Sequence, residues 1–543
     1  MPKGRAVVEG GTGTGWRGKG PWAALAGLVA LHVILAALLF DPKPFLGGDN
    51  AGYMILADAL RTGRGYRDIY LPGAPLHAQY PPVYPTILAV VALLGGGLIS
   101  FKTLSVGFTT ASLLVLYLLA RRRLDGTAAF GVTVPFALSP LVLDYSHWVL
   151  SEAPFLLLTL VALWGGVQME DDRSRPVIVA TIFALLAYLT RAAGLPLIAA
   201  LLLALAWRRD WKRLGRVAIA AGAVIGGWWV WGRLAATGSA RVYTNNFLLI
   251  NPYQPELGYV GPGDLIVRLV NNIRLYGVEV LPRALAGQSA LGAFALPGIL
   301  TALAILALAI AGWGGSVGRR RIGLLEAFIF FYAGLILLWP QVWTDRRFLL
   351  PLLPVILLFA VEGAIWAFEF VRVGRPGWVL PALGILIGLL AIPDHVRTAS
   401  VNQRCLRFYR QGDRLACYPP AWRSFFQAAS WVRDGTPADV VVVSRKPRLF
   451  FLFGRRQGDV YPFTTDDRRM LDFFDTLGAD YVVVAGLSAT TGRYLVPAIE
   501  RNRDRFQLAY RVGDPPATTF VLRYLRGPGS GAAQPGGPGG GGR

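Results

Sequence analysis

The sequence predicts an all-helical membrane bundle of about eleven spanning helices, followed by a small α/β domain on the outer face. Of its 543 residues, 54% are hydrophobic and 16% are charged, and the charges gather between long apolar runs. A run such as Trp22 to Phe40 is long enough to cross a hydrocarbon core of about 30 Å as a helix. From about Pro419, short strand and helix patterns replace these runs.

Loops rich in arginine and lysine predict the orientation, because such loops stay on the cytoplasmic side. They lie at Lys3 to Lys19, Arg121 to Arg123, Arg173 to Arg175, Arg208 to Arg216, Arg319 to Arg321 and Arg372 to Arg375. Alternation between them predicts spans near residues 22–40, 102–120, 126–143, 153–168, 177–189, 192–207, 217–235, 291–312, 322–340, 348–370 and 377–393. The net charge of +22 is therefore explained by the cytoplasmic loops of a protein in a bacterial plasma membrane, and no nucleic-acid partner is expected.

This topology divides the chain into four parts. Residues 1–21 form a cytoplasmic segment, and residues 22–393 form the transmembrane domain, with outer loops at 41–101 and 236–290. Residues 394–526 form the extracytoplasmic α/β domain, and the Gly- and Pro-rich residues 527–543 form a disordered tail. The apolar stretch 83–99 would break the alternation as a span, so we expect it to lie along or partly in the outer surface.

The C-terminal domain alternates strand-like and helix-like patterns. Strands are expected at residues 439–444, 449–453, 481–485, 506–511 and 519–524, and helices at 422–433, 467–476 and 494–503. Cys405 and Cys417 both fall outside the membrane, and their spacing would let a disulfide close a short loop. The alternative is two unpaired thiols.

Two acidic residues are candidates for catalysis. Asp49 follows the first span, at the start of a helical pattern, where a partly desolvated carboxylate could take a proton from a hydroxyl as a general base. Glu152 follows Ser151 at the outer start of a later span, where an unpaired carboxylate would be costly. Helix capping is the alternative for both, with Ser151 as the capping residue at the second site.

Three arginines sit at the outer edge against the positive-inside trend: Arg191, Arg346 and Arg347. The guanidinium group offers a planar fork of donors that matches phosphate oxygens, so a lipid phosphate would offset the cost of this placement. The alternative is that each side chain extends to ordinary lipid headgroups.

Other catalytic patterns are missing from the sequence. It contains no Walker-type loop, no nucleophile elbow, no Cys-x-x-Cys and no His-Glu-x-x-His. His77 and His147 are the plausible outer metal ligands, so no cofactor is required and a divalent metal is left open.

Short motifs in a specific order resemble the GT-C superfamily of integral-membrane glycosyltransferases, in the branch with the protein O-mannosyltransferases and the bacterial lipid A aminoarabinose transferases. The similarity runs roughly from Trp22 to Phe370. It rests on Gly-Asp-x-x-x-Tyr at residues 48–53, Tyr-Pro-Pro-x-Tyr-Pro at 80–85, Ser-His at 146–147 with Leu-Ser-Glu-x-Pro-Phe at 150–155, Leu-Thr-Arg at 189–191 and Arg-Phe-Leu-Leu-Pro at 347–351.

The resemblance implies inverting transfer from a polyprenyl-phosphate sugar on the outer face, to a lipid, glycan or protein acceptor. It implies that Asp49 is the catalytic carboxylate, that Glu152 is the acid of the second outer turn, and that Arg191 with Arg346 or Arg347 holds the donor phosphate. The same motifs supply candidate substrate-binding residues, which are Tyr53, His77, Tyr80, Tyr84 and His147.

This chain departs from the pattern in one respect. The aminoarabinose transferases carry Glu-Lys before the proline of the second motif, whereas this chain has Tyr80 directly before Pro81. A metal or a phosphate-binding lysine at that position is therefore not expected here.

Two other classes of protein would share some of these features. A transporter or flippase of a lipid-linked glycan would use the arginines for phosphate without needing Asp49 as a base, but it would more often show internal repeats and charges near the midplane. An assembly factor anchored by its helices would not need so many spans.

Overall fold

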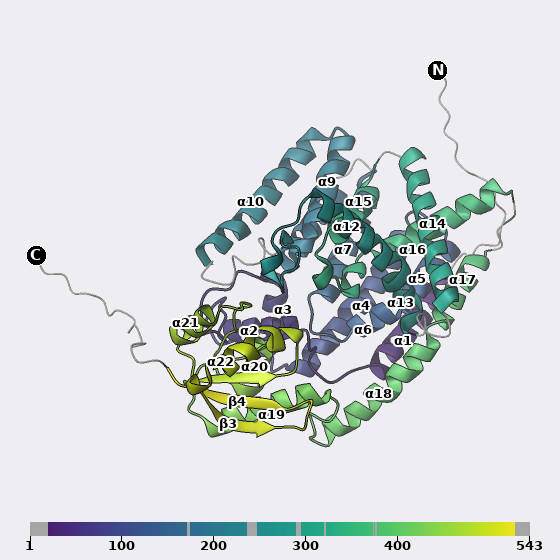
Figure 1. Ribbon diagram of the computed structural model, residues 1–543. Coiled ribbons are helices and arrows are strands. Elements are labelled where there is room, and N and C mark those ends of the chain that lie inside the picture. Colours follow the sequence, from purple (N-terminus) through teal and green to yellow (C-terminus); the bar gives the residue numbers. More distant parts are fainter. Residues whose placement is uncertain are drawn as a thin grey trace, which may run out of the picture.

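The computed structural model describes residues 20–170, 174–235, 247–288, 295–319, 322–372, 374 and 377–526. The predicted N-terminal segment up to residue 19 and the predicted tail at 527–543 lie outside the described residues. So do parts of the predicted loops, at residues 171–173, 236–246, 289–294, 320–321, 373 and 375–376. Figure 1 shows a bundle of helices with the C-terminal domain packed against one end.

Each predicted span coincides with an apolar helix. These helices are α1 (Gly20–Leu38), α4 (Leu98–Ala120), α5 (Gly126–Ala137), α7 (Glu152–Val167), α8 (Ser174–Thr190), α9 (Leu195–Trp207), α10 (Trp211–Ala235), α14 (Ala295–Arg319), α15 (Leu324–Leu337), α16 (Leu353–Phe370) and α17 (Val379–Leu389).

The length and hydropathy typical of a membrane span are reached by five helices of the described chain: α1, α4, α10, α14 and α16. A sixth would be added if α17 and α18 (Ile392–Arg410), which meet at an angle of 45°, were counted together. Six further apolar helices have 10–17 residues. The total of about eleven spans therefore stays a prediction.

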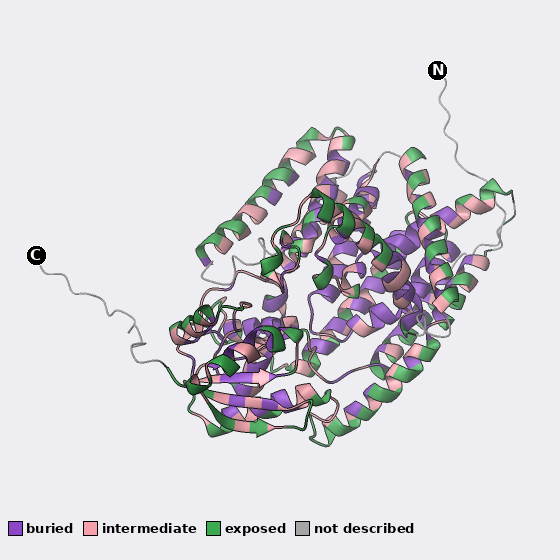
Figure 2. Ribbon diagram, in the orientation of Figure 1, coloured by how far each residue is buried: buried purple, intermediate pink, exposed green. Residues whose placement is uncertain are grey.

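The bundle is closely packed inside and apolar on its periphery. Helices α14 and α16 touch through Gly312 and Gly363, and a Cβ atom added at either would lie 2.0 Å from a carbonyl oxygen of the other helix. Small residues of this kind let helix backbones approach in a membrane protein. Figure 2 shows buried residues through the centre and exposed residues on α10 and α18. On α10 the exposed residues include Ile219 and Leu234, as expected of a helix that faces lipid.

A buried charge cluster joins the turn after α4 to α15 and α16. The Arg123 guanidinium contacts Glu326 and Glu362 at 2.6 Å each. It also donates a hydrogen bond to Ser316 at 2.8 Å. The sequence placed Arg123 in a cytoplasmic loop, and its two carboxylate partners explain why it can be buried there.

Further helices of the described residues lie between the spans. They are α2 (Asp49–Arg61), α3 (Val83–Leu93), α6 (Pro140–Tyr145), α12 (Pro262–Arg274) and α13 (Leu281–Ala286). Helix α3 covers most of the stretch that was expected to lie along the membrane surface, and it packs against α2. Its C-terminal end leaves Leu93 and Leu94 exposed.

The C-terminal domain is an α/β unit with one four-stranded sheet in the order β1-β2-β4-β3. The strands are β1 (Val442–Val443), β2 (Tyr481–Ala485), β3 (Phe506–Val512) and β4 (Thr519–Tyr524). Strand β1 pairs parallel to β2, and the other pairs are antiparallel. Its helices are α19 (Pro420–Gly435), α20 (Pro447–Gly454), α21 (Asp467–Leu477) and α22 (Val496–Arg501). Cys405 and Cys417 form a disulfide with a Cα–Cα distance of 5.6 Å, which joins α18 to the start of this domain.

One predicted strand is wrong. Residues 449–453 belong to helix α20, and an apolar run of this length does not by itself distinguish a strand from a buried helix. Leu449 and Phe450 lie in the domain core. Phe451 and Leu452 pack against the first long loop, which connects α1 to α4, and Leu452 packs against the domain core as well. Burial on two sides explains why the run is apolar throughout.

Helix α20 and the segments on either side of it attach the C-terminal domain to the first long loop. The amide of Gly458 donates to the Tyr70 carbonyl at 2.9 Å. The Lys446 ammonium donates to the Gly47 carbonyl at 3.1 Å, beside the start of α2. Ala51 of α2 belongs to the apolar core of the C-terminal domain. The domain therefore covers the loop that carries Asp49.

Candidate active site

Asp49 lies in the first turn of α2, and its carboxylate points away from the helix backbone. The N-cap is Gly48, with φ of 100°, and no side chain caps this end. One carboxylate oxygen, Oδ1, accepts a hydrogen bond from the Tyr80 hydroxyl at 3.0 Å, and the other, Oδ2, accepts one from Arg347 Nη1 at 2.7 Å. Asp49 therefore faces other loops instead of capping its own helix.

Arg347 joins the two candidate acids. Its Nη1 atom lies 2.7 Å from Asp49 Oδ2 and 3.3 Å from Glu152 Oε1. Glu152 begins α7 and is 3% exposed, and the same oxygen also pairs with Arg191 Nη1 at 2.5 Å. The two acids and these two arginines, which are far apart in sequence, thus form one charged cluster where α7, α8 and the turn before α16 meet.

Ser151 and Tyr53 extend this cluster. The Ser151 hydroxyl accepts a hydrogen bond from Arg191 at 3.0 Å and shares one with the Tyr53 hydroxyl at 2.7 Å. Ser151 is the N-cap residue of α7, but its side chain makes no capping bond to that helix. Its hydroxyl holds the guanidinium group of Arg191 instead.

The surroundings of Asp49 favour its ionised form. Burial by itself would raise the pKa of this carboxyl, but the charge and hydrogen bond of Arg347, the charge of Arg448 and the Tyr80 hydrogen bond together hold the pKa below its ordinary value. A carboxylate held in this way is ready to accept a proton, but it is a weak base for as long as Arg347 stays on it.

Tyr80 connects Asp49 to the C-terminal domain. Its hydroxyl, which donates to Asp49, accepts a hydrogen bond from Arg448 Nη1 at 2.5 Å. Arg448 also donates to the Gln79 side chain at 2.6 Å. Gly52 makes room for this arrangement, because a Cβ atom there would lie 2.7 Å from the Tyr80 ring and 3.3 Å from Arg448.

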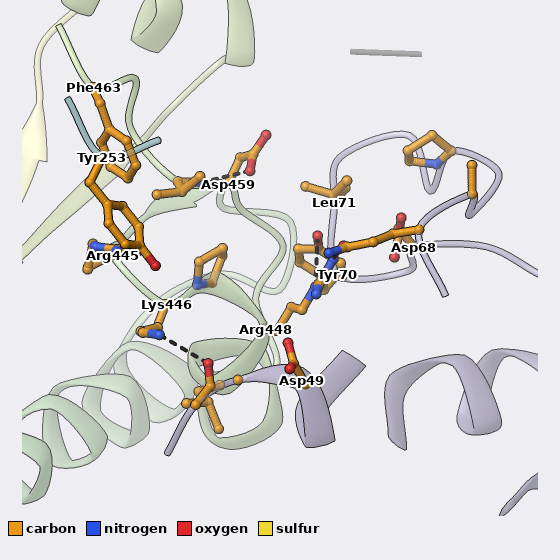
Figure 3. A pocket seen from close by; sticks show the side chains of 18 of the residues that line it. Asp49, Asp68, Tyr70, Leu71, Tyr253, Arg445, Lys446, Arg448, Asp459 and Phe463 are labelled. Atoms are coloured by element: carbon orange, nitrogen blue, oxygen red, sulfur yellow. Dashed lines mark hydrogen bonds between the residues drawn. The ribbon is translucent and has the colours of Figure 1, made fainter. Parts of the chain in front are cut away.

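Two cavities meet at Asp49. The first, which we call the helix cavity, has a volume of about 150 Å³ and is lined by Arg191, Arg347 and a wall of apolar side chains. That wall is formed by Tyr332, Leu335, Ile336, Trp339 and Phe348. The second, which we call the domain cavity, has a volume of about 330 Å³ and lies between the first long loop and the C-terminal domain (Figure 3). Asp49 lines both cavities, so its carboxylate can reach a group that enters from either one.

Three of the other predicted substrate-binding residues support the site from behind or beside it. His77 is buried, with Nδ1 2.9 Å from Asp68, and its Nε2 accepts a hydrogen bond from the Tyr80 amide at 2.7 Å. Tyr53 packs against Tyr80, with ring centroids 4.5 Å apart, and lines the helix cavity. Tyr84 is fully buried behind Tyr53. His77 thus fixes the position of Tyr80.

Arg346 and His147 lie at a different cavity. Arg346 pairs with Asp144, and these two residues line that cavity together with His147 and His395. His147 is buried against Trp148 and Phe40. Of the neighbouring arginines 346 and 347, only Arg347 points toward Asp49.

The sequence reasoning missed the contribution of the C-terminal domain. Arg445, Lys446 and Arg448 precede or begin α20, and all three line the domain cavity. The available signal in the sequence was the basic run at residues 445–448, which follows a short apolar strand. The strand wrongly predicted at residues 449–453 drew attention away from these basic residues. Within the described part of the chain, no group of three or more His, Cys, Asp or Glu side chains is arranged to hold a metal ion.

Comparisons with known proteins identify similar chains and folds. The family model described as "Dolichyl-phosphate-mannose-protein mannosyltransferase" matches residues 79–230. No curated protein sequence is similar enough to match.

Solved structures share the fold at low sequence identity. ArnT from Cupriavidus metallidurans, bound to undecaprenyl phosphate, is 14% identical with a TM-score of 0.54, over 94% of this chain and 98% of that one. The oligosaccharyltransferase AglB from Archaeoglobus fulgidus, in complex with an inhibitory peptide and a dolichol-phosphate, is 14% identical with a TM-score of 0.51, over 85% of this chain and 69% of that one. The predicted resemblance is confirmed: the chain is a multi-pass membrane protein with the GT-C fold.

Proposed function

We propose that this chain transfers a sugar from a polyprenyl-phosphate donor to an acceptor hydroxyl on the outer face of the membrane, with inversion and with Asp49 as general base. The observation that carries the proposal is the position of Arg347, between the carboxylates of Asp49 and Glu152 where the helix cavity and the domain cavity meet. This position brings a carboxylate that can accept a proton next to a guanidinium group that can bind phosphate, which supports the proposal.

The helix cavity suits the donor. Arg191 and Arg347 supply forked donors for phosphate oxygens, and the apolar wall from Tyr332 to Phe348 suits the first part of a lipid chain. The bound undecaprenyl phosphate and dolichol-phosphate in two structures of the same fold support this class of donor. Arg346 lies at another cavity, so we assign the donor phosphate to Arg191 and Arg347.

The reaction is a single displacement. The acceptor oxygen attacks the anomeric carbon from the side opposite the phosphate, and the carbon–oxygen bond to phosphate breaks. The electron pair leaves with the polyprenyl phosphate, whose charge Arg191 and Arg347 stabilise. The hydroxyl proton passes to Asp49, and the attack from the opposite side inverts the anomeric centre.

Donor binding also activates the base in this scheme. In the free protein, Arg347 holds the pKa of Asp49 below its ordinary value. A donor phosphate competes for the same guanidinium group, and any weakening of the Asp49–Arg347 pair raises the basicity of Asp49. Glu152, which is 3% exposed and contacts both arginines, keeps them in place while the phosphate binds and leaves.

Sugar transfer by purified protein tests the proposal. The protein in lipid nanodiscs is given a panel of polyprenyl-phosphate sugars and a membrane extract as acceptor, with Asp49→Asn beside wild type. We expect transfer by wild type and a loss of at least about a hundredfold in folded Asp49→Asn. Undiminished transfer in Asp49→Asn would remove its role as base. If wild type binds lipid-linked sugars but transfers none, the chain is instead a transporter or flippase of lipid-linked glycans.

A further inference from the structure

The domain cavity contains positive charge that the cavity does not neutralise. Arg445, Lys446 and Arg448 all line it, and none of the three forms an ion pair with a carboxylate among the described residues. Their partners are neutral oxygens: Arg445 donates to the Thr490 hydroxyl at 2.8 Å, and Lys446 donates to the Gly47 carbonyl. Partly buried cations without counter-charges are costly, and an anion in the cavity would offset that cost.

The acidic residues of the same cavity are occupied or partly neutralised. Asp49 is paired with Arg347, and Asp68 lies 2.9 Å from the His77 ring. Asp459 accepts a hydrogen bond from the Val460 amide, and burial raises the pKa of its carboxyl. The charge of Asp68 acts on Arg448, so the carboxylates of the cavity leave the charges of Arg445 and Lys446 uncancelled.

Two of the three cations, Arg445 and Lys446, also have N–H donors that no described residue accepts, whereas Arg448 donates through all three of its nitrogens to Tyr70, Tyr80 and Gln79. A lysine ammonium has three N–H donors, and Lys446 uses one of them within the described part of the chain. Arg445 bonds through Nε, which leaves both terminal amino groups without a hydrogen-bond partner among the described residues. These are the groups that grip a phosphate or carboxylate.

Two helix N-termini add to the positive potential at this wall. Helices α2 and α20 both begin there, at Asp49 and Pro447, and neither has a side-chain cap. The first amides of a helix have no partners within the helix and favour negative charge. In α2 the Asp49 carboxylate already occupies the first turn, so α20, which has arginine in its first turn, presents the uncompensated end.

Aromatic rings lie beside the cations. Tyr253 and Phe463 line the same cavity, with ring centroids 6.1 Å apart, and the Arg445 guanidinium lies over both rings (Figure 3). Flat apolar faces next to convergent polar groups are typical of small-molecule sites. The C–H face of a sugar ring packs well against such surfaces, and a cavity of about 330 Å³ has room for a hexose.

We propose that the domain cavity is the acceptor site and that it recognises a saccharide carrying an anionic group, a phosphate or a carboxylate, through Arg445 and Lys446. This inference rests on the proposed function, because it identifies which substrate enters opposite the donor. An acceptor held there presents its hydroxyl to Asp49, which lines the cavity, while the donor occupies the helix cavity on the other side.

Binding of defined saccharides to the full-length protein in nanodiscs tests the site without requiring transfer. The probes are glucose 6-phosphate, glucuronate and neutral glucose, titrated by calorimetry. We expect the two anionic sugars to bind at least tenfold more tightly than glucose, and the stronger of them identifies the preferred anion. Arg445→Gln combined with Lys446→Gln should lower that affinity at least tenfold. The matched control is Arg469→Gln, on α21, whose side chain is 78% exposed and does not line the cavity.

Several results would overturn the inference. The first is that the anionic sugars fail to bind folded wild type, and the second is that glucose binds as tightly as they do. The third is that the folded double variant binds them with unchanged affinity. The fourth is that polyprenyl phosphate displaces the anionic sugar, which would place the donor phosphate in the domain cavity. The two proposals fail separately. If the protein binds anionic sugars but transfers sugar from no donor, the anion site stands and the proposed enzyme activity is refuted. If it transfers sugar but does not bind anionic sugars, the enzyme activity stands and the anion site is refuted.

Discussion

Replacing Arg347 by glutamine tests the electrostatic arrangement of the site. The variant removes the charge that lies 2.7 Å from Asp49 and 3.3 Å from Glu152. Two unit charges at 2.7 Å interact with about 6 kcal/mol at an effective dielectric constant of 20, and solvent reduces this because the two side chains are 18% and 33% exposed. Losing one preorganised donor to a developing oxyanion costs about 10²–10³-fold in rate, and we expect a loss of kcat/KM in that range.

The pH dependence of the rate separates this mechanism from simple loss of donor affinity. In wild type, Arg347 holds the pKa of Asp49 down, so the base stays ionised and the rate falls only at low pH. Without Arg347, the largest of the influences that lower the pKa of Asp49 is gone, so its pKa should rise and the acidic limb of the profile should move upward by about 1–3 units. The limb moves to higher pH because protonated Asp49 cannot accept the hydroxyl proton, and a higher pKa keeps Asp49 protonated up to a higher pH.

The assay is sugar transfer between about pH 4 and pH 9 at saturating donor, with melting temperatures to confirm folding. Arg347→Lys retains the positive charge but loses the paired N–H donors of the guanidinium group. The acidic limb should therefore stay near its wild-type position, while the rate of sugar transfer falls. Arg346→Gln, which removes the neighbouring arginine paired with Asp144, should cost much less than Arg347→Gln. An acidic limb that does not move in folded Arg347→Gln would refute the proposed control of Asp49.

Two further predictions concern stability. Gly363→Val should lower the melting temperature in detergent strongly, because a side chain there meets the backbone of α14 at 2.0 Å, whereas Gly215→Val, on α10 where nothing lies within 4 Å, should cost only a small change in helix propensity. A Gly363→Val protein as stable as Gly215→Val would mean that α14 and α16 are not in close contact. Cys417→Ser opens a loop of 12 residues to Cys405 and should destabilise the C-terminal domain by about 2–3 kcal/mol, measured by denaturant unfolding under oxidising conditions. Equal stability of the variant and wild type under those conditions would show that the disulfide adds no stability.

Much of the fold follows from local patterns. Apolar runs and the Arg- and Lys-rich loops between them predicted each helix that coincides with a span, because a chain in hydrocarbon must satisfy its backbone hydrogen bonds within each helix. Strands β2 and β4 were predicted at their observed bounds, since each is a short apolar run between turn residues. The strand expected at 449–453 failed because a five-residue apolar run carries no decisive period, and contacts on both sides of α20 decided its form.

The sequence by itself determined the membrane bundle, the separate C-terminal domain and a short set of acids and arginines on one face. These are properties of composition, length and loop charge, which act locally along the chain. Only the tertiary structure decided which members of that set meet. It placed Arg347 and not Arg346 on Asp49, and it brought Arg448 of the C-terminal domain to Tyr80. Such contacts join residues separated by hundreds of positions, and adjacent arginines point to different cavities because the backbone between α15 and α16 turns between them.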